Sequence, residues 1–251
     1  MRKGHPVSLR SRGGGLLMPS QIVMLAGEPE YRSHLTMRPI ASLMERELGA
    51  RVRYHTPSSI PDEPDFAESS FGDLSDLEDA ELLIIYTRFR RLPDDEMKAL
   101  ESFLERGGAV VGLRTSTHAF RFAPEEPWAD WNLGFGRDVL GSPWISHHGH
   151  DSSTEVTLRA DAPVEFVRGL PDQFHVRSWL YHTELQPWCR PILDGAPVDP
   201  QCPPTPGPVA WYGEPDNRRR FYTSLGHAED LQQEPVRRLL CNAVGWAVGI
   251  S

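Results

Sequence analysis

The sequence has 251 residues, 39% of them hydrophobic, and a formal net charge of −9, so it can bury one sizeable core. The acidic balance argues against a nucleic-acid partner, because proteins that bind the phosphate backbone normally carry a basic face. No apolar run approaches the roughly 20 residues of a membrane span, and the three cysteines are too scattered for a disulfide framework, so we expect a cytoplasmic protein without a membrane partner.

Residues 1–17 are basic and glycine-rich. They lack the apolar central region of a secretory signal, so we expect a disordered extension that does not direct export. Met18, followed by Pro19 and Ser20, is a natural beginning for the folded part. We therefore expect one domain over residues 18–251.

The first half of this domain alternates strands and helices. Apolar residues at helical spacing predict helices over residues 36–48 and 93–106, the second followed by Gly107 and Gly108. Short apolar runs predict strands over residues 21–26, 51–55, 82–86 and 109–113, with a loop over 57–79. This order implies right-handed crossovers and a doubly wound, mostly parallel sheet flanked by helices.

The second half is less regular. Residues 120–151 are rich in Trp, Gly and His without a clear period, which is typical of a long excursion over the edge of a sheet. We expect antiparallel strands over 155–159 and 176–185, a proline-dense loop over 197–208, a strand over 221–225 and a closing helix over 235–248. The α/β fold should therefore carry an added antiparallel portion. The short basic runs 88–91 and 218–220 are expected to be solvated strand ends.

Polar side chains follow two of the predicted parallel strands. Residues 114–118 (RTSTH) come directly after the strand over 109–113, and residues 27–33 (GEPEYRS) after the first strand. In open α/β sheets, ligands bind beyond the carboxyl ends of the strands, so both segments belong to the expected site. Carboxylates and Arg suit sugar hydroxyls and Trp faces suit sugar rings. The expected substrate-binding residues are Glu28, Glu30, Tyr31, Arg32, Thr115 and Trp131. The alternative for Trp128, Trp131 and Trp144 is packing of the long loop on the sheet.

Four ordered segments carry a family resemblance: residues 27–33, 112–120 (GLRTSTHAF), 128–150 (WADWNLGFGRDVLGSPWISHHGH) and 209–230, which ends in RRRFYTSLGHAED. Together they resemble the ThuA-like, or trehalose-utilisation, family over roughly residues 20–249. That family is similar in fold to the class I glutamine amidotransferases. The resemblance therefore implies a flavodoxin-like α/β fold and a role in carbohydrate metabolism.

The comparison with amidotransferases fails at the nucleophile. Their strand ends in G-x-C, which places a thiolate on a strained turn above an oxyanion hole. The same register here is Gly112-Leu113-Arg114, and a guanidinium cannot attack a carbonyl. Glutamine hydrolysis through a thioester is thereby excluded, unless Thr115 or Ser116 serves as the nucleophile. Arg114 is expected to be a clamp or an oxyanion stabiliser.

The partner motif of the amidotransferases, H-x-E, has a counterpart in His227-Ala228-Glu229. The resemblance implies that His227 is a general acid/base oriented by Glu229. His227 and Glu229 are two positions apart, so in an extended chain their side chains lie on the same face. The alternative is that His227 caps the following helix and Glu229 belongs to its solvated first turn.

Other histidines supply further candidates. His118 either points into the crevice, as a second acid/base or a metal ligand, or packs under the next helix. His147, His148 and His150 form the sequence HHGH, in which His147 and His148 could ligate a divalent metal such as zinc, although no cofactor is required by the sequence. Because adjacent residues of an extended chain face opposite sides, only one of His147 and His148 should face a shared metal.

These observations predict an enzyme that acts on a small-molecule carbohydrate. The substrate is a sugar or an oxidised (keto) glycoside, and the reaction is hydrolysis, elimination or isomerisation without a cysteine nucleophile. A paired-carboxylate glycosidase needs two acids at a defined separation and stays open. The alternative is a non-catalytic carbohydrate- or small-ligand-binding domain, and a homo-oligomer is compatible with either.

Overall fold

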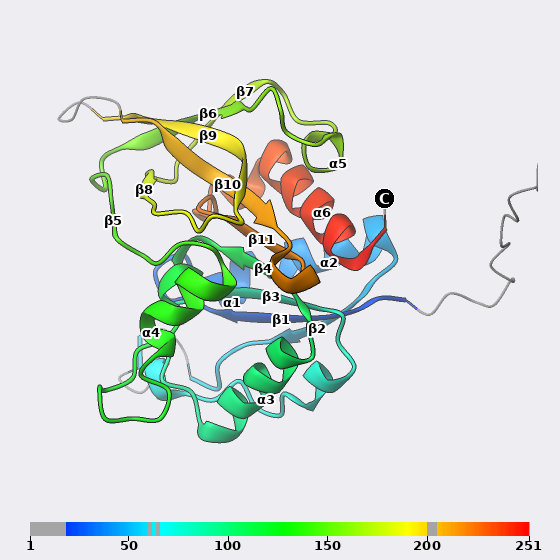
Figure 1. The fold of residues 1–251 in the computed structure, drawn as a ribbon, viewed down its shortest axis with the longest axis vertical. Helices are drawn as coiled ribbons and strands as arrows, with labels where there is room; N and C mark the ends of the chain where they lie inside the picture. Colours follow the sequence, from blue (N-terminus) through cyan, green and yellow to red (C-terminus); the bar gives the residue numbers. More distant parts are fainter. Residues whose placement is uncertain (1–18, 60–61, 64–65, 200–204, 251) are drawn as a thin grey trace, which may run out of the picture.

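The computed structural model describes residues 19–59, 62–63, 66–199 and 205–250. Their strands form a 9-stranded sheet in the order β2-β1-β3-β4-β11-β10-β9-β6-β7, and helices cover it (Figure 1). The first five strands in this order are parallel: β2 (Arg51–His55), β1 (Gln21–Gly27), β3 (Leu82–Thr87), β4 (Ala109–Leu113) and β11 (Arg220–Thr223). The others are antiparallel to their neighbours: β10 (Gly207–Gly213), β9 (Arg190–Val198), β6 (Ser153–Leu158) and β7 (Gln173–Val176).

The predicted α/β architecture is confirmed. The apolar runs of β1, β3 and β4 are neighbouring parallel strands, with Ile22 opposite Leu82 and Leu83 opposite Val110. Both faces are covered, which is why these strands are continuously apolar. Helices α2 (Arg38–Leu48) and α6 (Glu234–Val248) pack on the face that carries Met24, and α3 (Asp94–Glu105) packs on the opposite face (Figure 1).

The long excursion over residues 120–151 contains more structure than predicted. It holds the short helix α4 (Trp131–Gly134), a π-helix (Phe135–Val139) and the strand β5 (Ser146–His147). β5 pairs with β8 (Tyr181–His182) in a separate 2-stranded sheet. The strand expected over residues 176–185 is therefore wrong, because β7 ends at Val176 and the chain leaves the main sheet before β8.

The proline-dense loop expected over residues 197–208 is also partly wrong. Pro197 and Val198 end β9, and Gly207 and Pro208 begin β10. A proline removes only its own N–H donor, and the register between β9 and β10 shifts between Pro208 and Ala210, as at a β-bulge. The prolines are thus tolerated inside paired strands.

The remaining helices are short. They are α1 (Ser33–Thr36), α5 (Val164–Val167) and the 3₁₀ helices Phe66–Glu68, Ser75–Glu78, Arg114–His118, Pro215–Asn217 and Asp230–Gln232. In the described part of the chain, no helix is long and apolar enough to cross a membrane. The extension predicted over residues 1–17 lies outside the described residues.

Candidate functional site

A small cavity of about 170 Å³ lies beyond the carboxyl ends of the parallel strands. In the order β2-β1-β3-β4, the chain proceeds from β1 to β2 on one side and to β3 on the other, so the strand order switches between β1 and β3. Open α/β sheets bind ligands at such a switch point. We call this cavity the aromatic pocket, because most of its wall is made of aromatic and imidazole rings. It is lined by Glu30, Tyr31, Arg88, Phe89, Thr115, His118, Trp144, His147, His150, Trp179 and Tyr181.

The turn after β1 is organised by a buried carboxyl group. Glu28 is 0% exposed, and its carboxyl oxygens accept the backbone N–H groups of Glu30 at 3.0 Å and Tyr31 at 2.6 Å. The Glu28 N–H donates to the Ser33 hydroxyl at 2.7 Å. Burial raises the pKa of Glu28 to about 7. Glu28 therefore holds Glu30 and Tyr31 in the pocket wall without lining the pocket itself.

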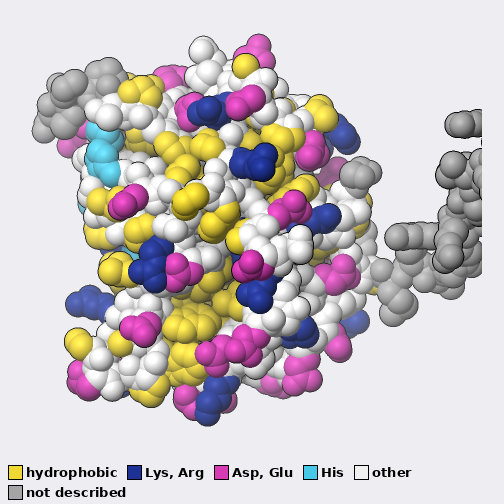
Figure 2. Space-filling model, viewed as in Figure 1, with side chains coloured by type: hydrophobic (Ala, Val, Ile, Leu, Met, Phe, Trp, Pro, Cys, Tyr) yellow, Lys and Arg dark blue, Asp and Glu magenta, His cyan; other side chains and the backbone are white. Residues whose placement is uncertain are grey.

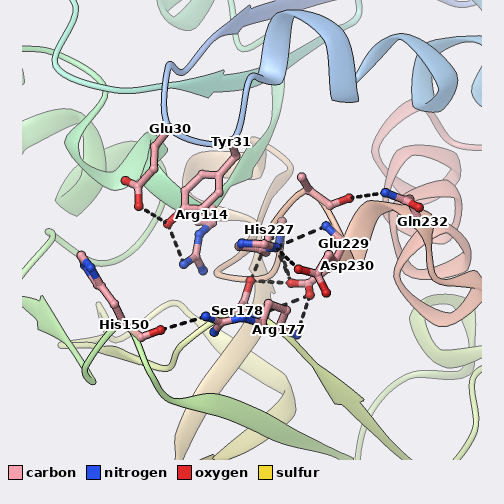
Figure 3. A network of polar contacts seen from close by, with 12 residues as sticks. Glu30, Tyr31, Arg114, His150, Arg177, Ser178, His227, Glu229, Asp230 and Gln232 are labelled. Carbon is pink, nitrogen blue, oxygen red and sulfur yellow. Dashed lines mark hydrogen bonds and ion pairs between the residues drawn. The ribbon is translucent and has the colours of Figure 1, made fainter.

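Arg114 lies behind the wall and not in the cavity. Its guanidinium is fully buried, donates to the Ser224 carbonyl at 2.9 Å and the Tyr31 hydroxyl at 3.0 Å, and lies 4.6 Å from the ring centres of Tyr31 and Trp179 (Figure 3). The Tyr31 hydroxyl in turn contacts a Glu30 carboxyl oxygen at 3.1 Å, and Arg88 pairs with the other oxygen of Glu30. Arg114 thus reaches the cavity through Tyr31 and cannot clamp a ligand directly.

Neither hydroxyl beside Arg114 is prepared as a nucleophile. The Thr115 hydroxyl donates to the Thr87 carbonyl at 2.9 Å, and the Ser116 hydroxyl donates to the Ile85 carbonyl at 2.7 Å. Activation of a hydroxyl requires a base within hydrogen-bond reach, and these contacts direct both protons to the backbone. The geometry does not favour the alternative of a Thr115 or Ser116 nucleophile.

His118 lines the aromatic pocket, as one of its two interpretations predicted. Its ring lies 5.0 Å from the rings of Phe89 and Trp144. Burial, reinforced by the charges of Arg88 and Arg114, lowers the pKa of His118 to about 3. His118 is therefore neutral near pH 7, where it can donate or accept a hydrogen bond but is a weak base.

The HHGH segment divides as the alternation of an extended chain predicts. His147 faces the pocket, where its ring stacks on His150 at 5.2 Å. His148 faces the other way, with its ring 4.9 Å from His182 and its Nδ1 3.5 Å from an Asp199 carboxyl oxygen. Among the described residues, no group of three His, Cys, Asp or Glu side chains is arranged to hold a metal ion. The predicted ligands His147 and His148 are therefore not brought together.

His227 lies beside the pocket rather than in it. Its ring stands edge-on to Tyr31 at 5.4 Å and Trp179 at 6.3 Å, and burial lowers its pKa (Figure 3). Glu229 does not bond the imidazole through its side chain: that side chain is 67% exposed, its carboxyl oxygen is 3.9 Å from His227 Nδ1, and its backbone N–H donates to that nitrogen at 3.3 Å. The predicted contact is present only as an ion pair at 3.9 Å, which is too long for the hydrogen bond that would orient the imidazole.

The carboxyl group that organises this loop belongs to Asp230. It is fully buried and accepts the backbone N–H of Arg177 at 2.7 Å, of Gly226 at 3.3 Å and of His227 at 3.2 Å (Figure 3). The Ser178 hydroxyl and N–H also donate to it. Asp230 therefore ties the His227 loop to the segment that carries Trp179.

Two predicted binding residues lie elsewhere. Arg32 is exposed, at φ +50° before α1. Trp131 lines a separate cavity of about 910 Å³, together with Leu104 and Phe135. Figure 2 shows hydrophobic side chains gathered between α3 and α4 on this face. Trp131 and Trp128 pack on one another at 5.6 Å, so for them the packing alternative describes the contacts observed, while Trp144 lines the aromatic pocket.

The basic run 88–91 is not simply a solvated strand end. Arg90 is fully buried and donates to the carbonyls of Phe66 and Ser69, and Arg88 lines the pocket. Sequence reasoning also missed Trp179 and Tyr181, which enter the pocket from the segment before and within β8. The two are two residues apart, so their sharing one face was the available signal.

Known proteins similar to this chain support the same fold. The family model described as ThuA, trehalose utilisation, matches residues 38–247. Comparison with curated proteins gives no significant match. A ThuA-like protein from Parabacteroides merdae is similar in structure, with a TM-score of 0.63 at 15% identity over 92% of this chain and 91% of that chain.

Two further solved structures have the same fold. A cytoplasmic protein from Salmonella typhimurium matches with a TM-score of 0.54 at 10% identity, over 90% of this chain and 98% of that chain. A beta-galactosidase from Rahnella sp. R3 matches with a TM-score of 0.51 at 12% identity, over 92% of this chain but 32% of that chain. At these identities the similarity shows the fold alone.

Proposed function

Because the chain belongs to the ThuA (trehalose utilisation) family, we propose that it binds a sugar or keto glycoside in the aromatic pocket and transforms it by proton transfer. The observation that carries the proposal is the composition of the pocket wall. Rings such as Trp144 and Trp179 suit the apolar faces of a sugar, and Glu30, Arg88 and the imidazoles suit its hydroxyl groups. The cavity of about 170 Å³ is below the usual range of roughly 300 to 1,000 Å³, so one sugar unit is the natural occupant.

Glu30 is the proposed general base or acid. In the described part of the chain it is the one carboxylate that lines the pocket, since Glu28 is fully buried behind it. Tyr31 and Arg88 hold its two oxygens in fixed positions. A single lining carboxylate favours elimination or isomerisation of an oxidised sugar over a paired-carboxylate hydrolysis.

The imidazole of His147 is the proposed second proton carrier. His147 lines the cavity, and His227 contacts Tyr31 from behind the wall. Burial lowers the pKa of both, which keeps them neutral at pH 7 and leaves His147 able to accept a proton. Arg114 contributes a fixed positive charge through Tyr31, where it can stabilise a developing oxyanion.

The test uses trehalose, methyl glucoside and its 3-keto derivative as probes, with product formation followed by NMR. Replacing Glu30 with Gln keeps the volume and removes the titrating group, so turnover should fall by about 10²- to 10⁴-fold while binding, measured by calorimetry, changes little. Glu105→Gln is the matched control, because Glu105 is exposed at the end of α3. Unchanged turnover in Glu30→Gln would contradict the assigned role.

A non-catalytic carbohydrate-binding domain is the second candidate. It is favoured by the absence of a nucleophile and base pair at Thr115 and Ser116, whose hydroxyls both donate to backbone carbonyls. In the beta-galactosidase from Rahnella, moreover, this fold corresponds to 32% of a longer chain. Binding of a probe sugar without turnover of any of them would support this candidate.

A further inference from the structure

Arginine side chains stand against the rings that form the wall of the aromatic pocket. The distances from guanidinium carbon to ring centre are 5.1 Å for Arg88 and 5.6 Å for Arg121 over Phe89, and 4.6 Å for Arg114 and 5.7 Å for Arg177 over Trp179. Each of these rings lines the cavity. The pocket is therefore walled by aromatic faces with cations behind or beside them.

The negative charge available to these cations is small. Glu30 lines the pocket and is bonded by Arg88. Glu28 lies behind it with a pKa raised by burial to about 7, so this carboxyl group is partly protonated near neutral pH. Within the part of the chain that the structure describes, Arg114 has no carboxylate within ion-pair distance, and its hydrogen bonds go to the neutral oxygens of Ser224 and Tyr31.

The histidines around the pocket respond to the same field. Burial is the largest cause of the lowered pKa of His118, His147 and His227, and the charge of Arg114 adds to the lowering for each of them. Carboxylates act in the opposite direction on two of them: Asp230 and Glu229 on His227, and Glu30 on His147. The cavity thus disfavours a positive charge, including that of an imidazolium.

We infer that the sugar bound in this pocket is anionic, carrying a carboxylate or a phosphate, and that Arg88 contacts the anionic group. Arg88 lines the cavity with its side chain 31% exposed, whereas Arg114 is fully enclosed and supplies charge without contact. In the described part of the chain, Arg88 makes both of its carboxylate contacts, to Glu30 and to Glu28, through Nη1, so Nη2 has unused donor capacity. A planar guanidinium suits the paired oxygens of either anionic group. The inference rests on the proposed function, because it names the class of sugar for the same site.

The experiment compares anionic sugars with neutral counterparts by calorimetry. Glucuronate and its neutral amide, glucuronamide, differ chiefly in charge, and glucose with glucose 6-phosphate gives the corresponding phosphate pair. We expect an anionic sugar to bind about tenfold or more tightly than its neutral counterpart, with a preference that weakens as salt is added. The anion with the greater preference identifies the anionic group. Equal affinities within both pairs would overturn this inference and leave the proposed function standing, whereas no binding of any of the sugars would overturn both.

Variants place the selectivity at Arg88. Arg88→Gln should weaken binding of the anionic sugar much more than binding of the neutral sugar, and so remove most of the preference. Arg46→Gln is the control for net charge, because Arg46 is exposed on α2. If Arg88→Gln fails to fold, Arg121→Gln removes an exposed cation over the same Phe89 ring and should reduce the preference in part. Retention of the full preference in a folded Arg88→Gln protein would overturn the role of Arg88.

Discussion

Replacing Asp230 with Asn should destabilise the protein far more than any change at the neighbouring Glu229. The Asp230 carboxyl group is fully buried, and both of its oxygens accept hydrogen bonds from backbone N–H groups. One oxygen accepts from Arg177 and Ser178, and the other from Gly226 and His227. An Asn amide presents an oxygen to one pair and an NH₂ group to the other, so in either orientation two N–H donors face a donor.

The magnitude follows from those two lost bonds. A buried N–H left without an acceptor costs about 1 to 3 kcal/mol, so two should cost about 2 to 6 kcal/mol, and less for the Gly226 and His227 pair, because the His227 N–H also donates to the Ser178 hydroxyl at 3.1 Å. This is a large share of the roughly 5 to 15 kcal/mol that stabilises a typical domain. The Glu229 side chain is 67% exposed, so Glu229→Gln should change the free energy of unfolding by no more than about 0.5 kcal/mol.

Urea unfolding followed by circular dichroism measures both effects. Asp230→Asn should lower the midpoint clearly, with the slope unchanged if only stability is altered. A second reading comes from the His227 ring, whose nitrogen shifts in NMR report its position and its pKa. Asp230→Asn should lower that pKa further, since the Asp230 charge raises it. An Asp230→Asn protein with the urea midpoint of the wild type would refute the assignment of Asp230 as the organiser of this loop.

Three other changes test separate parts of the structure. Burial raises the pKa of Glu28 from 4.5 to about 7, so between these pH values the folded protein keeps a proton that the unfolded chain releases, and the free energy of unfolding should fall as the pH rises. Urea titrations at several pH values should show this slope for the wild-type protein and not for Glu28→Gln. A Cβ at Gly136 would lie 2.2 Å from the Thr117 carbonyl oxygen, so Gly136→Ala should cost about 1 to 3 kcal/mol in thermal or urea unfolding, while Gly149→Ala, with nothing within 4 Å, should be nearly neutral. His118, with its pKa lowered to about 3, should stay neutral in NMR spectra down to pH 5, and titration near pH 6.5 would contradict its burial among the pocket rings.

The parallel half of the fold could be predicted because its signals are local. β3 and β4 are buried throughout and almost entirely apolar, because helices cover both faces of the sheet. The helices α3 and α6 carry apolar residues at helical spacing, and both predicted ranges agree with the structure to within about two residues at each end. These patterns arise because the sheet buries one side of each helix, and the helices bury both faces of each strand, along the whole length of the element.

The antiparallel half could not be predicted as fully because its pairing is not local. β9 lies between β10 and β6 in the sheet, so two partner strands support its prolines. β6 is distant from β9 in sequence, and β10 pairs with β9 across a register shift. Likewise β8 leaves the main sheet to pair with β5, some 35 residues earlier in the chain, and that pairing carries Tyr181 to the pocket. No periodicity within either segment specifies such a partner.

The site was predicted where chain order alone determines it. The predicted strand ends placed Glu30, Tyr31 and Thr115 at the same edge of the sheet, and the structure puts all three in the pocket wall. The role assigned to Glu229 depended on the direction of one side chain, which turns to solvent at the start of a 3₁₀ helix. Directions of this kind are decided by tertiary hydrogen bonds, here those that Asp230 makes.

Arg114 occupies a strained turn at the carboxyl end of β4. In the register where the resemblance to amidotransferases expects a cysteine on a strained turn, Arg114 has φ +44°, in the left-handed region that costs a residue with a side chain about 1 kcal/mol or more. The surrounding structure compensates: the Tyr222 hydroxyl donates to the Arg114 carbonyl, and the guanidinium donates to Ser224 and Tyr31. The turn thus buries a cation among rings. Any chemistry at this edge of the sheet therefore depends on the groups that face the cavity, and the positive charge of Arg114 acts on them from behind the wall.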